Sequence, residues 1–339
     1  MSNTLHHKLA TMLDVVYPEA DTGVLADQLL ETMGLAWDTS APPAYQNDWD
    51  ESDVMLITYA DTVQRKGEKP LQTLNRFLDD CLNDTVSAVH ILPFFPYSSD
   101  DGFSVMDYLA VNESHGDWTD IERIADDYKL MADLVINHMS ARSRWFENFR
   151  KRIDPGKDYF FEARPTDDLS AVVRPRTSPL LNAVQTEDGE RYVWCTFSED
   201  QVDLNFANPQ VLNEFVGIIR YYLERGVTIF RLDAVAFLWK EVGTPSIHLQ
   251  QTHELIKILR LLIEHHTPES CHYGNQRSQP RESDLLRQRQ RSPCDLQLFV
   301  AAAADQHSGH WQLPPPENLA DEHAAGADGH HLSQLHCLP

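Results

Sequence analysis

The sequence lacks any apolar run near the roughly 18 uninterrupted residues that a membrane-spanning helix needs, and it is poor in positive charge. Its 339 residues carry 28 Lys and Arg against 52 Asp and Glu, which gives a formal net charge of −24. Because that charge repels phosphate backbones and anionic lipids, we expect neither nucleic acid nor a membrane as a partner. An anionic substrate needs a local basic patch to approach such a surface.

Cysteine is also scarce. There are five cysteines, and only Cys81 and Cys195 precede residue 269. This odd, scattered set argues for reduced thiols rather than a disulfide framework. The first residues do not show the charged-then-apolar order of a secretory signal, so a cytoplasmic location is expected. No cofactor and no metal site is predicted.

Apolar runs of strand length alternate with amphipathic runs of helix length over residues 51–268. Strands are predicted at residues 54–60, 86–95, 129–138 and 227–235, and helices at residues 5–16, 22–35, 70–82, 118–128, 209–225 and 247–266. Alternating strands and helices predict an α/β fold with a parallel sheet. Four such units are the front half of a (β/α)8 TIM barrel. A doubly wound sheet is the alternative, but the first strand–helix loop has no Gly-rich phosphate fingerprint.

The chain divides into five predicted parts. They are an N-terminal helical segment (1–50), the first part of the barrel (51–139), an excursion domain after strand three (140–206), the barrel continuation through strand four and its helix (207–268), and a tail (269–339). The excursion is aromatic, irregular and too long for a simple connector.

The tail differs in composition from the rest of the chain. It contains no Ile, Lys, Met or Thr, yet holds seven of the sixteen His and three of the five Cys. No periodic apolar pattern is present, so we do not expect it to fold natively. A metal-binding domain is one interpretation, although CxxC and HxxxH-type spacings are missing, and a disordered linker is another.

We favour a third interpretation of the tail, an out-of-frame translation. Back-translation with permitted codons, shifted by one nucleotide, yields strings such as AITETNVPNRE that have the character of an ordinary folded chain. A frameshift near codon 268 is therefore expected, and sequencing of the gene across that codon decides it.

The fourth predicted strand ends in FRLDAV, which places Arg231 and Asp233 on one face, two residues apart. At the carboxyl end of a barrel strand this face looks into the active site. Arg231 can hold Asp233 ionised and oriented, as a carboxylate nucleophile at a sugar's anomeric carbon requires. A structural ion pair at a strand end is the alternative.

Polar residues also follow the other three predicted strands. His138 is placed to donate to a sugar hydroxyl, or to serve as a structural histidine, and Asp133 is placed to anchor a loop. Aromatic faces beside polar groups suit a sugar's apolar face and hydroxyl rim. The candidates of this kind are Asp61 after strand one and Asp101, Phe103, Asp107 and Tyr108 after strand two.

The motifs DLVINH, VDLNFANP and FRLDAVAFLWKEVGT, in this order, resemble the α-amylase clan, glycoside hydrolase family 13. Within the clan, SSDDGFSVMDY, SEDQVDLNFANP and KEVGT resemble the sucrose-phosphorylase group. The resemblance covers about residues 50–268 and implies a retaining α-glucoside phosphorylase that transfers glucose to inorganic phosphate through a β-glucosyl-enzyme. The expected partners are therefore a small sugar and phosphate.

The resemblance also implies residue roles. Asp233 is the nucleophile and Arg231 its partner, His138 and Asp61 bind the glucosyl ring, and Gln201 and Asp203 line the pocket. In VVRPRTSPLL, Arg174 and Arg176 are candidates for an anionic acceptor, with exposed surface charge as an equal alternative. Tyr108 stands where sucrose phosphorylases carry His, and AFLWKE follows Asp233 where they carry a Gly-Tyr pair, so a sucrose phosphate or glucosylglycerate donor is favoured over sucrose.

A retaining enzyme needs a second carboxyl group, the acid/base, about 5 Å from the nucleophile. In the family this is a Glu after strand five, and the chain changes composition where that strand is due. The acid/base Glu is therefore absent, although the shifted text ITETN contains one, and we expect the chain as given to be inactive and unstable. An α-glucosidase or transglucosylase, and a non-catalytic sugar-binding half-barrel, remain as alternatives.

Overall fold

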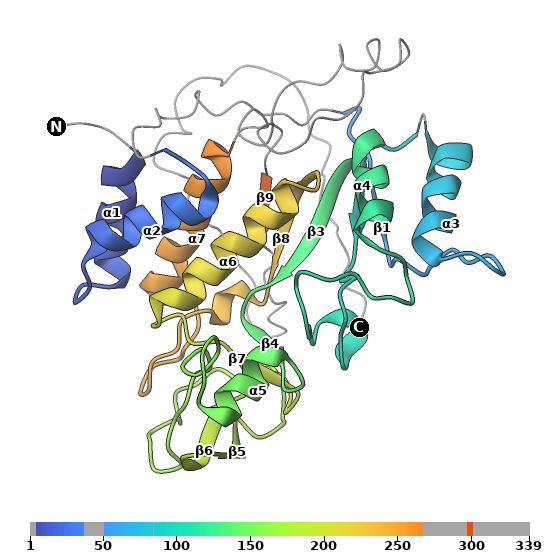
Figure 1. Cartoon of the computed structure of the whole chain (residues 1–339). Coiled ribbons are helices and arrows are strands. Elements are labelled where there is room, and N and C mark those ends of the chain that lie inside the picture. Colours follow the sequence, from blue (N-terminus) through green and yellow to red (C-terminus); the bar gives the residue numbers. More distant parts are fainter. Residues whose placement is uncertain (1–4, 37–50, 84, 267–296, 301–339) are drawn as a thin grey trace, which may run out of the picture. The chain divides into compact units, whose positions relative to one another are not determined.

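The computed structural model describes residues 5–36, 51–83, 85–266 and 297–300, all of which belong to one compact unit, Met1–Ala301. These residues form an α/β fold in which helices pack against a parallel sheet (Figure 1). Within the described residues, no helix has the length and apolarity needed to cross a membrane.

The central sheet has five strands in the order β1-β2-β3-β8-β9, and every neighbouring pair is parallel. The strands are β1 Met55–Thr58, β2 Ala88–Ile91, β3 Lys129–Val135, β8 Val227–Asp233 and β9 Gln297–Val300. The four strands predicted from the apolar runs are present, and each is shorter than its run, most of all β2, which covers only Ala88–Ile91 of the predicted 86–95. Parallel pairing confirms the predicted fold class, and it brings the carboxyl ends of β2, β3 and β8 to one edge.

Strand β9 lies in the tail, where no element was expected. Its backbone pairs with β8 from Ile229 to Leu232. The tail was expected not to fold natively, and these four residues nevertheless form a strand. The physical reason is that the outer edge of β8 offers unpaired N–H and C=O groups that a short extended segment can satisfy. The rest of the tail, with its candidate metal ligands, lies outside the described residues.

Four helices follow the strands of the sheet. They are α3 Pro70–Phe77, which continues as the π-helical turn η1 Leu78–Leu82, α4 Trp118–Asp127, α6 Pro209–Leu223 and α7 Gln250–His265. Their starts have local causes. Asp117 and Asp120 form a capping box at α4, and the Asn208 side chain caps α6, whose first residue is Pro209.

The N-terminal segment contains α1 Leu5–Val16 and α2 Thr22–Met33. Helix α1 packs on α2 and α7, and α2 packs on α6. Leu5, Leu9 and Leu13 recur every four residues along α1 and are buried, so this stripe faces the core. The two helices thus join the helical layer beside the sheet.

The segment between β3 and α6 leaves and rejoins the sheet through a short antiparallel ladder. Strand β4 His138–Ser140 pairs with β7 Gln201–Asp203. Between them lie α5 Arg144–Lys151 and the hairpin of β5 Leu181–Thr186 and β6 Gly189–Trp194. The third predicted strand therefore ends at Val135, and His138 begins a different strand. Two 3-10 turns, η2 Asp100–Gly102 and η3 Val235–Phe237, follow β2 and β8.

Candidate active site

Arg231 and Asp233 lie at the carboxyl end of β8 and face the same way. The Arg231 Nη2 atom is 3.2 Å from Asp233 Oδ1, and the two side chains are 25% and 18% exposed. Their alternation along the strand explains the shared face. The predicted pairing is present, and the Asp233 carboxylate is open to a ligand while still held by a cation.

A second carboxylate also contacts the Arg231 guanidinium. Asp133 on β3 is fully buried, forms an ion pair with Arg231 and lies 2.8 Å from His90 Nε2 on β2 through its other oxygen. Asp133 and Arg231 are register partners across β3 and β8. The prediction that Asp133 anchors a loop is wrong, because both its oxygens point to neighbouring strands. His90 was not predicted; a lone histidine in the apolar run VSAVHILPFF was the available signal.

The electrostatic setting of Asp233 is mixed. Burial raises the pKa of the Asp233 carboxyl above its ordinary value of 3.8, Arg231 and His138 oppose that shift, and Asp133 adds to it. Burial disfavours the Arg231 cation, but Asp133 and Asp233 more than compensate and raise the pKa of its guanidinium. Asp233 therefore has a higher pKa than a surface aspartate, although it lies beside the permanent cation of Arg231. This combination suits a nucleophile.

The backbone beside Asp233 is strained. Ala234 has φ 51°, and Asp100 and Asp101 in the loop after β2 have φ 56° and 50°. Non-glycine residues rarely adopt this region and pay an energetic cost there. Gly102 has φ 104°, and an added Cβ would come within 2.9 Å of Pro93, so only glycine fits. Strain is thus concentrated in the two loops that flank the carboxylate.

His138, Gln201 and Phe103 form the next part of the site. The His138 ring is buried, and its Nε2 atom lies 3.0 Å from the Phe103 carbonyl and 3.1 Å from Gln201 Nε2. Gln201 Nε2 also donates to Asp100 Oδ2 at 2.9 Å, and the Arg231 guanidinium lies 5.5 Å from the Phe103 ring centroid. Burial lowers the pKa of His138, so its ring is neutral at pH 7. These three predicted residues do come together with Arg231.

Two other predicted residues are placed differently. The Tyr108 ring is buried among aromatic side chains, and its hydroxyl donates to the Val135 carbonyl at 2.6 Å. Asp203 is fully buried and lies 3.1 Å from the ammonium group of Lys240. The polar atoms of both side chains are occupied by partners within the protein, and direct contact with a substrate stays a prediction. Lys240 was present in the KEVGT motif but was not singled out.

The remaining candidates are exposed in loops. Asp61 follows β1, and its carbonyl accepts from Gln64. Arg174 and Arg176 lie between α5 and β5, and Arg174 donates to the Ser178 carbonyl. The backbone N–H of Val173 donates to Pro245 at 3.0 Å, so this segment runs beside the loop after β8. In the described part of the chain, these three side chains make no hydrogen bond or ion pair with Arg231 or Asp233.

A ring of hydroxyl groups surrounds Asp200 at the edge of the site. The hydroxyls of Ser98, Ser99 and Ser104 all donate to Asp200 Oδ2. Burial alone would raise the pKa of this carboxyl, but these hydrogen bonds hold it below its ordinary value of 3.8. The serines belong to the motif SSDDGFS, in which the sequence predicted a role for a carboxylate and none for the hydroxyls. The ring joins the loop after β2 to the excursion.

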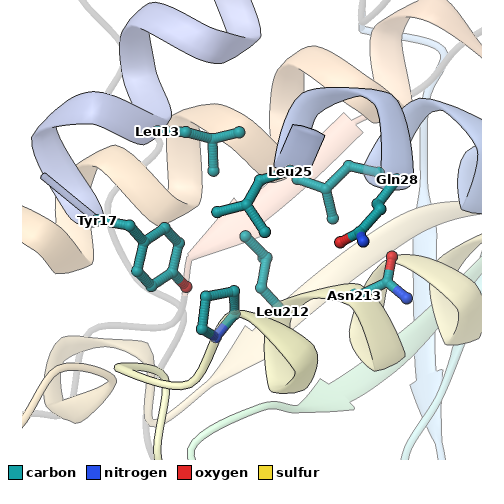
Figure 2. A pocket seen from close by; sticks show the side chains of 8 residues that line it. Leu13, Tyr17, Leu25, Gln28, Leu212 and Asn213 are labelled. Carbon is teal, nitrogen blue, oxygen red and sulfur yellow. The ribbon is translucent and has the colours of Figure 1, made fainter. Parts of the chain in front are cut away.

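Hollows also lie away from the Arg231–Asp233 pair. Figure 2 shows one between α1, α2 and the start of α6, where Leu13, Leu25 and Leu212 face a common space beside the amides of Gln28 and Asn213. It has no charged lining residue. In the described part of the chain, no three His, Cys, Asp or Glu side chains are grouped so that they could hold a metal ion.

Comparison with known proteins shows the family to which the chain is similar. A model of the α-amylase catalytic domain matches residues 80–291, a range that runs past residue 268. The chain is 52% identical over 219 residues to a glucosylglycerate phosphorylase of Spirochaeta thermophila, covering 65% of this chain and 37% of that protein. It is 44% identical over 265 residues to a glucosylglycerate phosphorylase of Escherichia coli, covering 78% and 47%.

A solved structure agrees. The crystal structure of sucrose 6F-phosphate phosphorylase from Thermoanaerobacter thermosaccharolyticum matches with a TM-score of 0.58 and 29% identity, over 64% of this chain and 47% of that one. The chain thus spans less than half the length of these relatives. On the family match and the parallel sheet with Arg231 and Asp233 at its edge, the chain belongs to the α-amylase family.

Proposed function

We propose that this chain carries the glucosyl-binding part of a retaining α-glucoside phosphorylase, with Asp233 as the nucleophile and Arg231 as the group that orients it. The observation that supports this most is the partly exposed Asp233 carboxylate, which has a raised pKa and lies 3.2 Å from a guanidinium that also pairs with Asp133. Phosphorylases among the similar proteins support the reaction class.

The proposed reaction has two displacements. An Asp233 oxygen attacks the anomeric carbon, the glycosidic C–O bond breaks, and the leaving oxygen takes a proton from a general acid. An oxygen of inorganic phosphate then attacks the same carbon, which releases glucose 1-phosphate and the Asp233 carboxylate. His138, Gln201 and Phe103 surround the glucosyl ring in this proposal, and Asp61 meets it from the loop after β1.

The donor is proposed to carry an anionic group. Two similar proteins act, by their names, on glucosylglycerate, and Tyr108 and AFLWKE already disfavour sucrose. Arg174 and Arg176 are the exposed cations proposed to meet that anion, since their segment runs beside the loop after Asp233. Exposed surface charge is the alternative role for both.

We further propose that the 339-residue chain does not turn over natural glucosides. The second carboxyl group of a retaining site is assigned to the Glu that a frameshift near codon 268 removes, and loss of a general acid costs about 10² to 10⁴ in rate. We also propose the five-part domain division and the cytoplasmic location given above. Sequencing the gene across codon 268 tests the frameshift, and an intact long frame contradicts it.

An activated substrate tests the nucleophile without the missing acid. α-Glucosyl fluoride has a leaving group that needs no protonation, so Asp233 alone suffices for the first step. We expect intact-protein mass spectrometry to show one glucosyl unit added to the chain, and no addition in Asp233→Asn. An unmodified wild-type chain, shown to be folded by circular dichroism, contradicts the proposal.

Two alternatives give different results in the same experiment. If added phosphate releases glucose 1-phosphate from the labelled chain, the phosphorylase assignment holds, whereas release of free glucose favours an α-glucosidase or transglucosylase. A third candidate is a non-catalytic sugar-binding half-barrel, because no carboxyl group in the described part of the chain is assigned the acid/base role beside Asp233. That candidate predicts saturable glucose binding by calorimetry with no covalent adduct.

A further inference from the structure

A buried lysine lies under the site and has no part in the chemistry above. The Lys240 side chain is 1% exposed, and its ammonium group lies 2.8 Å from Asn137 Oδ1, 3.1 Å from Asp203 Oδ2 and 3.2 Å from the Leu204 carbonyl. Lys240 lies in the loop after β8, Asn137 lies just after the end of β3, and Asp203 is the last residue of β7. One cation thus joins three separate segments of the chain.

The contacts of Lys240 decide which way the Asn137 amide faces. Its Oδ1 atom meets the ammonium, and its Nδ2 atom donates to Asp203 Oδ2 at 3.1 Å. An amide turned the other way would set Nδ2 against the ammonium and Oδ1 against the carboxylate, two repulsive contacts in a buried place. Neighbours of opposite charge therefore hold the amide in one orientation.

This orientation is passed on to the next residue. Asn137 Nδ2 lies 3.3 Å from His138 Nδ1, so that ring nitrogen faces a donor and must be the unprotonated one. On the far side of the ring, Nε2 lies 3.0 Å from the Phe103 carbonyl, an acceptor. The Gln201 amide nitrogen, 3.1 Å from His138 Nε2, has acceptors for both of its hydrogens in Asp100 Oδ2 at 2.9 Å and the Phe103 carbonyl at 3.5 Å, so it does not need the ring nitrogen as an acceptor. Both sides of the ring agree on one tautomer.

We propose that Lys240 is a positioning residue that, by orienting the Asn137 amide, fixes His138 in the tautomer with its proton on Nε2. His138 then presents an N–H donor toward the Phe103 side of the site, where a hydroxyl of a ligand can replace the carbonyl as acceptor. The opposite tautomer would present a bare nitrogen there and would leave two donors facing each other at Nδ1. The value of this donor rests on the function proposed above, but the tautomer does not.

The test is nitrogen NMR on the full 339-residue chain with isotope-labelled histidine, at about pH 8, where a buried histidine of lowered pKa is neutral. His138→Gln identifies the signals of His138 among the sixteen histidines. We expect Nε2 to show the shift of a protonated nitrogen and Nδ1 that of an unprotonated one. The reverse pattern overturns the proposal. No turnover is needed, so a failure of the proposed function leaves this result unaffected.

Substitutions test the role of Lys240 itself. The pair Lys240→Met with Asp203→Asn removes both buried charges, and we expect the ratio of Nε2–H to Nδ1–H to fall about tenfold, the worth of one buried hydrogen bond. Lys257→Met, which breaks an exposed ion pair with Glu254 on α7, is the matched control and leaves the ratio unchanged. An unchanged ratio in the folded double variant overturns the proposal.

A second variant keeps the test decisive if the double variant does not fold. Asn137→Asp retains Lys240 and Asp203 but replaces the Nδ2 donor with an oxygen acceptor of nearly the same shape. The proposal then requires a proton on His138 Nδ1. A His138 that still has an unprotonated Nδ1 in Asn137→Asp overturns it.

Discussion

The Lys240–Asp203 ion pair beside the site is buried, whereas the carboxylates that pair with Arg152 near the β5–β6 hairpin are exposed. Lys240 and Asp203 have side chains that are 1% and 0% exposed. Around the hairpin, Arg152 meets Asp158 and Asp188, whose side chains are 58% and 54% exposed. Breaking a buried pair strands a charge in a medium that cannot solvate it, whereas water replaces a lost partner at the surface. Burial, more than the number of ion pairs, therefore sets what each network contributes.

The largest expected effect is at the buried pair. Lys240→Met leaves Asp203 buried without its cation, and we expect a loss of about 3–5 kcal/mol in the free energy of unfolding, measured by urea titration. Adding Asp203→Asn removes the stranded charge and should recover much of that loss. If Lys240→Met alone costs less than about 1 kcal/mol, the contrast with the hairpin fails.

The next effect concerns the ionisation of Asp233. Arg231 opposes the rise of the Asp233 pKa, so Arg231→Met should raise that pKa further, by about one pH unit or more. Because the nucleophile acts as a carboxylate, the rate of fluoride release from α-glucosyl fluoride falls as pH falls through this pKa. The acid limb of the pH–rate profile should therefore move to higher pH. Arg231→Lys keeps the charge and should move the limb less.

Asp200 lies between the two extremes, partly exposed but ringed by serine hydroxyls. Its folded pKa is depressed, so its contribution to stability is present above the unfolded value of about 3.8 and is lost as pH falls through the lower folded value. We expect Asp200→Asn to cost about 1 kcal/mol at pH 7, discounted for solvent screening, and less at acid pH. Urea unfolding at pH 7 and at a pH below about 3.8 measures the cost of the substitution. An equal cost at the two pH values would contradict the depressed pKa of Asp200.

The smallest effect is expected on the hairpin. Asp188→Asn weakens ion pairs with Arg152 and Arg191, in both of which the Asp188 carboxylate is 54% exposed and reached by water. The expected loss is below about 0.5 kcal/mol, and it should disappear as salt is added. A loss above about 2 kcal/mol that persists in high salt would place this network with the buried one.

Sequence patterns predict the elements of this molecule better than they predict its buried contacts. Periodicity suffices for the helices and strands, and the spacing of Arg231 and Asp233 along one strand is enough to place both on one face. His90 and Lys240 could not be found this way, because their partners are reached through sheet register and loop geometry. Tyr108 and Asp203 show the converse. Their types suit a sugar site, but tertiary packing turns both inward.

The ladder between β4 and β7 has a consequence for how this protein can vary. His138 and Asp203 are register partners, so the excursion leaves and returns at adjacent points. Closing a flexible loop costs free energy that grows only with the logarithm of its length, about 0.6 kcal/mol for each doubling. Residues inserted or deleted around the β5–β6 hairpin should therefore leave the ladder, and with it His138, in place. The excursion can therefore change in length and sequence without disturbing the sheet.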